Sequence, residues 1–171
     1  MDAIVSPIKS ELECIAHLSG CLQMLQWDQE CFLPSKSIES RAQQKAVLAG
    51  LIHQKKCSPL MRSFMSDYFN LDSGQLLSNS LPSDQSRLMQ TLYRDWRLAT
   101  CLPEAFVIEW EKVTARAQHI WQSARNAADF SLFEPHLKHI VELCRQKAHY
   151  IGFNDHPYEA LLGCYEPGIT L

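Results

Sequence analysis

Glycine is scarce in this sequence, with only six among 171 residues. No segment of four or more residues alternates apolar and polar side chains with enrichment in β-branched residues. The sequence therefore lacks the pattern of a half-buried strand, whereas apolar residues recur at helical spacing along its length. We expect an all-α protein, an irregular array of several helices.

Long blocks of like charge are also missing. The longest is Lys55-Lys56, and 16 basic residues stand against 19 acidic ones. Phosphate binding needs a concentrated basic surface, so nucleic acid is not expected as a partner. No uncharged apolar run approaches the length of a membrane span, and Met1–Pro7 does not resemble a signal peptide, so no membrane is expected either.

Paired cysteines are a third absence. The seven cysteines are scattered and contain no CxxC pair. Without a secretion signal, this pattern is typical of reduced, mostly buried cysteines in a cytoplasmic protein.

The length and composition predict one helical domain or lobe over residues 1–171. Hydrophobic residues make up 46% and charged residues 20%, which is ordinary for a folded protein. Residues 71–83, with Asp72-Ser73-Gly74 and Ser78-Asn79-Ser80, are typical of a surface connection. If the chain is cut by a protease, we expect the cut there.

Proline, glycine and capping residues delimit the expected helices. Ser58 caps a helix with Pro59 in its first turn, Asp84 and Asp129 are expected caps of later elements, and Gly152 ends a helix. Glu166-Pro167-Gly168 is an expected turn. The predicted helices cover about 8–30, 38–56, 59–70, 84–101, 104–127, 130–151 and 157–162.

Three of these helices have distinctive apolar stripes. Small residues form a narrow seam on the second, which lets a neighbouring helix approach closely. The stripes on the fifth and sixth helices are expected to be buried. The stripes are Ala42, Ala46, Ala49 and Ile52; Phe106, Trp110, Val113, Ala117, Ile120, Trp121 and Ala124; and Leu137, Ile140, Val141, Cys144, Ala148 and Ile151.

No complete catalytic motif is present: the sequence has no HExxH, no phosphate-binding glycine loop and no GxSxG. A zinc peptidase needs two imidazoles one helical turn apart, a third ligand and a carboxylate base. No recognisable spacing supplies this set.

Two partial patterns resemble metal ligands. His136 and His139 lie three residues apart, but Leu137-Lys138 stands between them where a metallopeptidase helix would carry its glutamate. Cys14, His17 and Cys21 share one helix face. We interpret the histidines as solvent-side or boundary residues and the second group as small buried side chains.

Asp28 follows Trp27 near the end of the first long helix and is a candidate partner for an arginine. Arg41, Arg94 and Arg97 are the available guanidinium groups, which suit bidentate carboxylate pairing. Such a pair could shape the rim of a substrate groove or fasten one helix to another. We favour the second interpretation, because buried ion pairs more often fix packing than carry reactions.

Four short signatures in fixed order give the sequence a family resemblance. They are Leu25-Gln26-Trp27-Asp28-Gln29-Glu30 with Leu33-Pro34; Arg94-Asp95-Trp96-Arg97 with Ala99-Thr100 and Leu102-Pro103; Phe133-Glu134-Pro135-His136-Leu137; and Tyr158-Glu159-Ala160-Leu161-Leu162 with Tyr165-Glu166-Pro167-Gly168. Together they resemble the N-terminal third of the carboxypeptidase Taq family of zinc metallocarboxypeptidases. The sequence departs from the family pattern at Cys31, Leu33 and Gln54.

The resemblance implies a portion of a larger helical enzyme that removes single residues from peptide C-termini with one divalent ion, zinc or cobalt. This portion would build one wall of the groove over the metal. The HExxH part of the family is absent from this sequence, so the resemblance assigns no catalytic or metal-binding residue and no cofactor to this chain. A peptide substrate would need the catalytic part.

Three hypotheses follow. The chain is a portion of the peptidase that is inactive alone, or a helical binding module that docks onto a separate catalytic half or another protein, or an enzyme with an unrecognised site such as His136 and His139. A homodimer, typical of the family, is a further possibility. The first two hypotheses predict exposed apolar surface on the outer faces of residues 104–127 and 133–151.

Overall fold

The computed structural model describes residues 2–77 and 81–166, and helices dominate this part of the chain. An isolated bridge between Phe69 and Leu76 is the only β-type pairing among the described residues. The elements are α1 (Asp2–Val5), η1 (Ser6–Ile8), α2 (Lys9–Cys31), η2 (Ser35–Ser37), α3 (Ile38–Lys56), α4 (Pro59–Tyr68), α5 (Ser83–Cys101), α6 (Glu104–Ala127), η3 (Phe130–Leu132), α7 (Glu134–Ile151) and α8 (Pro157–Leu162). The all-α prediction is confirmed.

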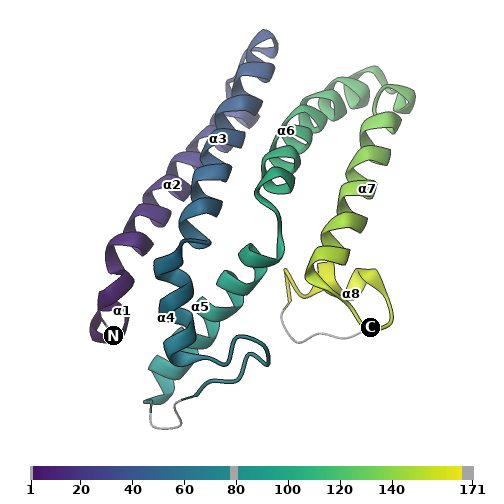
Figure 1. Cartoon of the computed structure of the whole chain (residues 1–171). Helices are drawn as coiled ribbons and strands as arrows, with labels where there is room; N and C mark the ends of the chain where they lie inside the picture. The colour runs from purple at the N-terminus through teal and green to yellow at the C-terminus, as the bar shows by residue number, and fades with distance from the viewer. Residues whose placement is uncertain (1, 78–80, 167–171) are drawn as a thin grey trace.

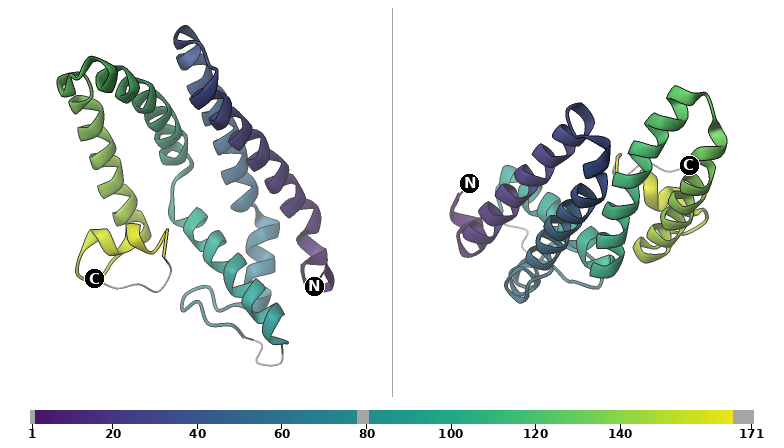
Figure 2. Two further views of the ribbon diagram at one scale, coloured as in Figure 1. Left: turned by 180° about the vertical axis from the view of Figure 1, so that it is seen from behind. Right: turned by 90° about the horizontal axis from the view of Figure 1, so that it is seen from above.

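The long helices form a row in which each packs against the next (Figures 1 and 2). Helix α3 lies against α2 on one side and α6 on the other, and α7 returns antiparallel to α6. Helices α4 and α5 lie near the N-terminus, at the other end of the molecule from the α6–α7 turn (Figure 1). None of the described helices is long and apolar enough to cross a membrane.

The small-residue seam of α3 has the predicted role. Ala42, Ala46 and Ala49 are buried. A Cβ atom at Gly50 would lie 3.3 Å from Cδ1 of Ile108 on α6, closer than most such contacts. The small side chains therefore let α3 and α6 pack closely.

The main apolar core lies at the α4–α5 end. It consists of Ile8, Met61, Phe64, Met65, Phe69, Met89 and Trp96. Phe69 stacks on Tyr93 with ring centroids 4.3 Å apart, and Tyr93 also contacts Trp96 at 5.7 Å. This aromatic cluster joins α4, the following turn and α5 in one packed unit.

Helix caps agree with the prediction at some positions. Ser58 Oγ accepts a hydrogen bond from the Met61 amide at 3.3 Å, and Gly152 has a positive φ of 86° at the end of α7. Asp84 does not cap α5, because the helix begins at Ser83 and no side-chain bond closes its end. Asp129 accepts from the Ser131 amide at 3.0 Å and so caps η3 rather than α7.

The predicted buried stripes need correction on α6 and α7. Trp121, Leu137 and Val141 are exposed, whereas Ala115 and Leu143 are buried although neither was predicted. Helical spacing identifies a continuous stripe, but it cannot tell whether a neighbouring element covers all of it.

Residues 71–77 follow α4 as a turn held by side chains. Asn70 Oδ1 accepts from the amides of Asp72 and Ser73, both at 3.0 Å, and the Tyr93 hydroxyl donates to the Leu71 carbonyl at 3.2 Å. Residues 78–80 of the predicted connection lie outside the described residues, as do Pro167 and Gly168 of the predicted last turn.

Candidate functional site

Of the three candidate arginines, Arg41 is the one that reaches Asp28. Its Nη2 lies 2.6 Å from Asp28 Oδ2, and its Nη1 donates to the Leu25 carbonyl at 2.7 Å. The Arg41 side chain is 11% exposed and that of Asp28 is 37% exposed. The carboxylate is therefore only partly buried, and the contact fastens the start of α3 to the end of α2.

Arg94 and Arg97 lie elsewhere. Arg94 Nη2 pairs with the adjacent Asp95 at 3.1 Å on the surface of α5, and Arg97 makes no ion pair with any described residue. Trp27 does not cover Asp28 in an apolar pocket; it is 52% exposed and meets Phe32 edge-on.

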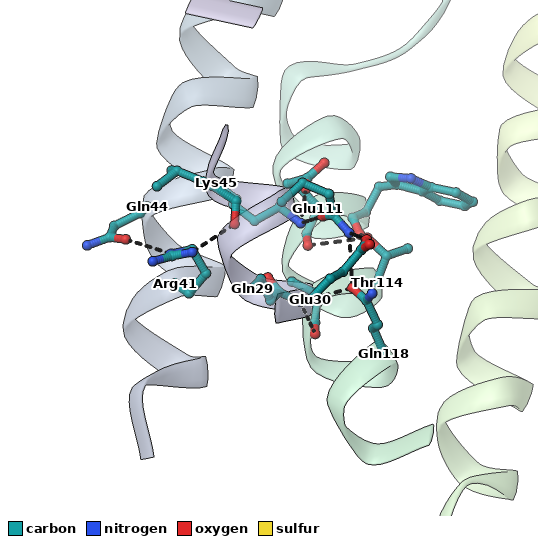
Figure 3. A network of polar contacts seen from close by, with 12 residues as sticks. Gln29, Glu30, Arg41, Gln44, Lys45, Glu111, Thr114 and Gln118 are labelled. Atoms are coloured by element: carbon teal, nitrogen blue, oxygen red, sulfur yellow. Dashed lines mark hydrogen bonds and ion pairs between the residues drawn. The ribbon is translucent and has the colours of Figure 1, made fainter. Parts of the chain in front are cut away.

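A buried polar network joins α2, α3 and α6 near the middle of the row (Figure 3). Lys45 is only 2% exposed. Its Nζ lies 2.9 Å from Glu111 Oε1 and also donates to Gln26 Oε1. Because an unpaired buried ammonium group is strongly unfavourable, these two acceptors are what allow a lysine in this position.

The network extends through two glutamine side chains. Gln29 Nε2 donates to the Ala115 carbonyl and to Gln118 Oε1, both at 3.1 Å, and Gln26 Nε2 donates to the same Gln118 oxygen at 3.1 Å. The Gln29 Oε1 atom is buried without a partner among the described residues. This network was not predicted, although Lys45 beside Ala42, Ala46 and Ala49 was a signal, since a lysine in a small-residue seam must be paired.

An apolar cleft of about 500 Å³ lies between α3, α5, α6 and α7. Its charged and polar lining comes from His53, Lys56, Asp95, Glu111 and Lys147. Asp28 and Arg41 do not line it. The predicted ion pair therefore does not form the rim of this cleft.

His53 is buried at the inner wall of the cleft. Its Nε2 lies 3.1 Å from the Ala99 carbonyl and 2.9 Å from the Leu102 carbonyl. Since both partners accept, this nitrogen carries the proton and donates to two carbonyls at the end of α5. The next residue, Gln54, donates to Glu104 Oε1 at 2.7 Å.

The histidine and cysteine patterns do not form a metal site. Within residues 2–77 and 81–166, no three His, Cys, Asp or Glu side chains are grouped as a metal would need. His139 Nε2 lies 3.5 Å from Glu109 Oε1 on α6. His17 and Cys21 are exposed, so the interpretation of their group as small buried side chains is wrong.

The cysteines are unpaired, and none of them is fully buried. Cys21 and Cys31 are exposed and the other five are intermediate, so the prediction that most are buried is wrong. Partial burial raises the pKa of the Cys57 and Cys144 thiols. A raised pKa lowers the thiolate fraction, which is the opposite of an activated nucleophile.

Within residues 2–77 and 81–166, the side chains present therefore do not fit a zinc ion. The described helices form an apolar cleft, and the buried Lys45 network joins α2, α3 and α6 beside it. Such a surface can position a bound molecule or a neighbouring element.

Comparisons with known proteins match this chain to part of longer proteins. Carboxypeptidase 1 of Bacillus subtilis is 27% identical over 160 residues, which is 94% of this chain and 31% of the relative. The crystal structure of BsuCP matches with a TM-score of 0.83 at 26% identity, over 95% of this chain and 31% of that one. The structure of Pyrococcus furiosus carboxypeptidase matches with a TM-score of 0.74 at 27% identity, over 99% of this chain and 33% of that one.

The chain thus spans about a third of the length of the relatives that it matches. The sequence pattern of the Carboxypeptidase Taq (M32) metallopeptidases matches residues 7–171, almost the whole chain. The resemblance carried by the four signatures is confirmed. This chain belongs to the Carboxypeptidase Taq (M32) metallopeptidase family, of which it represents the N-terminal third.

Proposed function

We propose that this chain is the helical, groove-wall portion of a metal-dependent carboxypeptidase that releases C-terminal amino acids from peptides, and that it is not catalytic by itself. One observation carries the proposal: a chain matched by this metallopeptidase family over residues 7–171 has no group of metal-binding side chains among its described residues. The metal, zinc or cobalt, and the groups that act on the peptide would belong to the remaining two thirds of the fold. We propose the cytoplasm as its location.

The cleft gives this chain a part to play in such an enzyme. Its walls are mainly apolar, with charged side chains from α3, α5, α6 and α7. The His53 hydrogen bonds and the Lys45 network join α3 to α5 and α6, so contacts within the chain hold these helices of the cleft in position. Its contribution would be to bind and orient, not to transfer protons.

The proposal is tested by release of the C-terminal residue from a blocked dipeptide, benzyloxycarbonyl-Ala-X, with zinc or cobalt added. The purified chain, shown to be helical by circular dichroism, is expected to release none. Carboxypeptidase 1 of Bacillus subtilis serves as the positive control. Release that a chelator abolishes, and that co-purifies with the chain through two columns, would overturn the proposal.

A second candidate function is a non-catalytic module that docks onto a separately encoded catalytic half or another protein. The observation that favours it is the large apolar surface exposed by α6, η3 and α7. Under this proposal the chain is again inactive alone, so the assay above does not separate the two. A binding measurement on that surface does.

A further inference from the structure

The far end of α6, η3 and the start of α7 expose several large apolar side chains. Trp121 is 43% exposed and Phe130 is 60% exposed. Leu132, Leu137 and Val141 are exposed as well. The sequence predicted apolar surface on the outer faces of these two helices, but Trp121, Leu137 and Val141 belong to the stripes that it predicted to be buried. We call these five residues, with the intervening Phe133 and Ile140, the α6–α7 apolar face.

Four members of the α6–α7 apolar face lie next to one another. Two adjacent hollows, of about 290 and 360 Å³, share Trp121 and Phe133 in their linings. Ile140 lines the first and Phe130 the second. Leu137 and Val141 follow Phe133 at four-residue intervals, so they continue the same stripe along α7.

Charges at the edge of this face are few and balanced. Arg125 lies over the Trp121 ring at 5.4 Å, and Lys138 pairs with Glu134 at 2.7 Å. No surplus of one sign is present that would select an acidic or basic ligand. Recognition at this face must therefore come from apolar contact, which suits a folded protein surface.

The total exposed surface indicates how much area is uncovered. A compact monomer of 19.6 kDa is expected to expose about 8,600 Å². This chain exposes 10614 Å², an excess of about 2,000 Å² over the expectation for its mass. This excess belongs to the whole chain and not to the α6–α7 apolar face alone. It is larger than the roughly 800 Å² per partner that a standard interface buries.

We propose that the α6–α7 apolar face is a docking surface for an apolar helical face of the remaining two thirds of the carboxypeptidase fold. The BsuCP structure matches this chain with a TM-score of 0.83. The match covers 31% of that structure, so about two thirds of its chain lies outside the match. A total surface about 2,000 Å² above the compact value is expected where other elements of a fold cover part of the chain. This inference rests on the proposed function and specifies which surface makes the contact.

The experiment uses the part of Bacillus subtilis carboxypeptidase 1 that follows its matched region, co-expressed with a tagged N-terminal third. The relative's own third is the positive control, and its recovery of the remainder shows that the remainder can assemble. This chain is then tested in its place, as wild type and as Trp121→Glu, Leu137→Glu and Leu60→Glu. Leu60, on α4, is 49% exposed and lies outside the face, so it is a matched control.

The wild type and Leu60→Glu are expected to co-purify with the remainder at a mass of one copy each. Trp121→Glu and Leu137→Glu are each expected to recover less of it, by about tenfold or more, because a charge then lies in a desolvated contact. All variants are first compared by circular dichroism. Using two independent variants at exposed positions protects the test against a single folding defect.

Three results would overturn the proposal. One is recovery of the remainder by both face variants as efficiently as by the wild type. Another is no recovery by this chain when the relative's own third succeeds. The third is a dimer of this chain alone that Trp121→Glu and Leu137→Glu convert to a monomer, because a second copy would then occupy the face.

The outcome is distinguishable from failure of the proposed function. Docking is read by mass, whereas the proposed function is read by release of amino acids from the chain alone. Chelator-sensitive release by the isolated chain would reject the function without changing the mass of the complex. Lost docking would leave the inactivity of the isolated chain as it was.

Discussion

The α4–α5 end and the α6–α7 end of this molecule differ in how they bury apolar side chains. The first encloses Met61, Phe64, Met65, Met89 and Trp96 in a shared cluster. The second buries mainly alanines and leaves Trp121, Phe130 and Leu137 at the surface. We infer that the first end is stable by itself, whereas the second presents apolar surface that other elements of the fold would cover. The Lys45 network lies between them.

The largest expected effect is on the free energy of unfolding, and it is measured by comparing one tryptophan from each region. Trp96→Ala removes a ring that is 4% exposed in the core, and we expect a loss of about 3–5 kcal/mol. Trp121→Ala removes a ring that is 43% exposed, and we expect a loss of about 1 kcal/mol or less. Urea unfolding followed at 222 nm measures both. Equal losses would contradict the difference between the regions.

Disrupting the Lys45 network should have the next largest effect on stability. Lys45→Ala leaves Glu111 and Gln26 without their shared donor, and we expect a loss of about 3 kcal/mol in unfolding free energy. The double variant Lys45→Met with Glu111→Leu should recover most of this loss, because it removes both charges together. A double variant that is less stable than Lys45→Ala would contradict this account of the Lys45 network.

The contact between α2 and α3 should matter less. Arg41→Ala removes the ion pair with Asp28 and the bond to the Leu25 carbonyl, and we expect a loss of about 1–3 kcal/mol. Arg97→Ala is the matched control on the surface of α5, with an expected change of about 0.5 kcal/mol or less. Differential scanning calorimetry can compare the two. A cost for Arg97→Ala equal to that of Arg41→Ala would show that the ion pair is not what stabilises α2 against α3.

The smallest expected effect concerns the exposed ion pair of Glu39 with Arg116, and it appears as a pH dependence of the melting temperature. Hydrogen bonds from Arg116, then from Gln43, lower the pKa of Glu39 from its ordinary 4.5 to about 2. A lowered pKa adds stability that is complete above 4.5 and disappears as the pH falls through about 2. The wild type should therefore exceed Glu39→Gln in melting temperature at pH 6, and the difference should shrink towards pH 2. Added salt should shrink it as well, and a gap that widens on acidification would contradict the assignment.

Much of this fold could be predicted from sequence, because helix limits depend on local chemistry. The range 38–56 and the last helix at 157–162 agree with the structure, since prolines or caps mark their ends. Asp84 was misassigned because Ser83 and Pro82 offer competing starts within one turn. Helical spacing found the stripe on α7 but could not show that Leu137 and Val141 are uncovered.

The candidate site was less predictable. Sequence reasoning placed Asp28 beside three possible arginines, but only the packing of α3 on α2 selects Arg41. The Lys45 network depends on Glu111, which is distant in the sequence and becomes a neighbour only when α3 packs against α6. Long-range contacts of this kind leave no periodic signal in a single sequence.

Hydrogen–deuterium exchange of the isolated chain tests the difference between the two regions most directly. Amide protection reports local opening, which depends on how much apolar contact holds a segment in place. We predict that amides of α4 and α5 exchange most slowly, and that those at the α6–α7 turn and the first half of α7 exchange about tenfold faster or more. Uniform protection across both ends would contradict the account, because the α6–α7 end would then be stable without any covering partner.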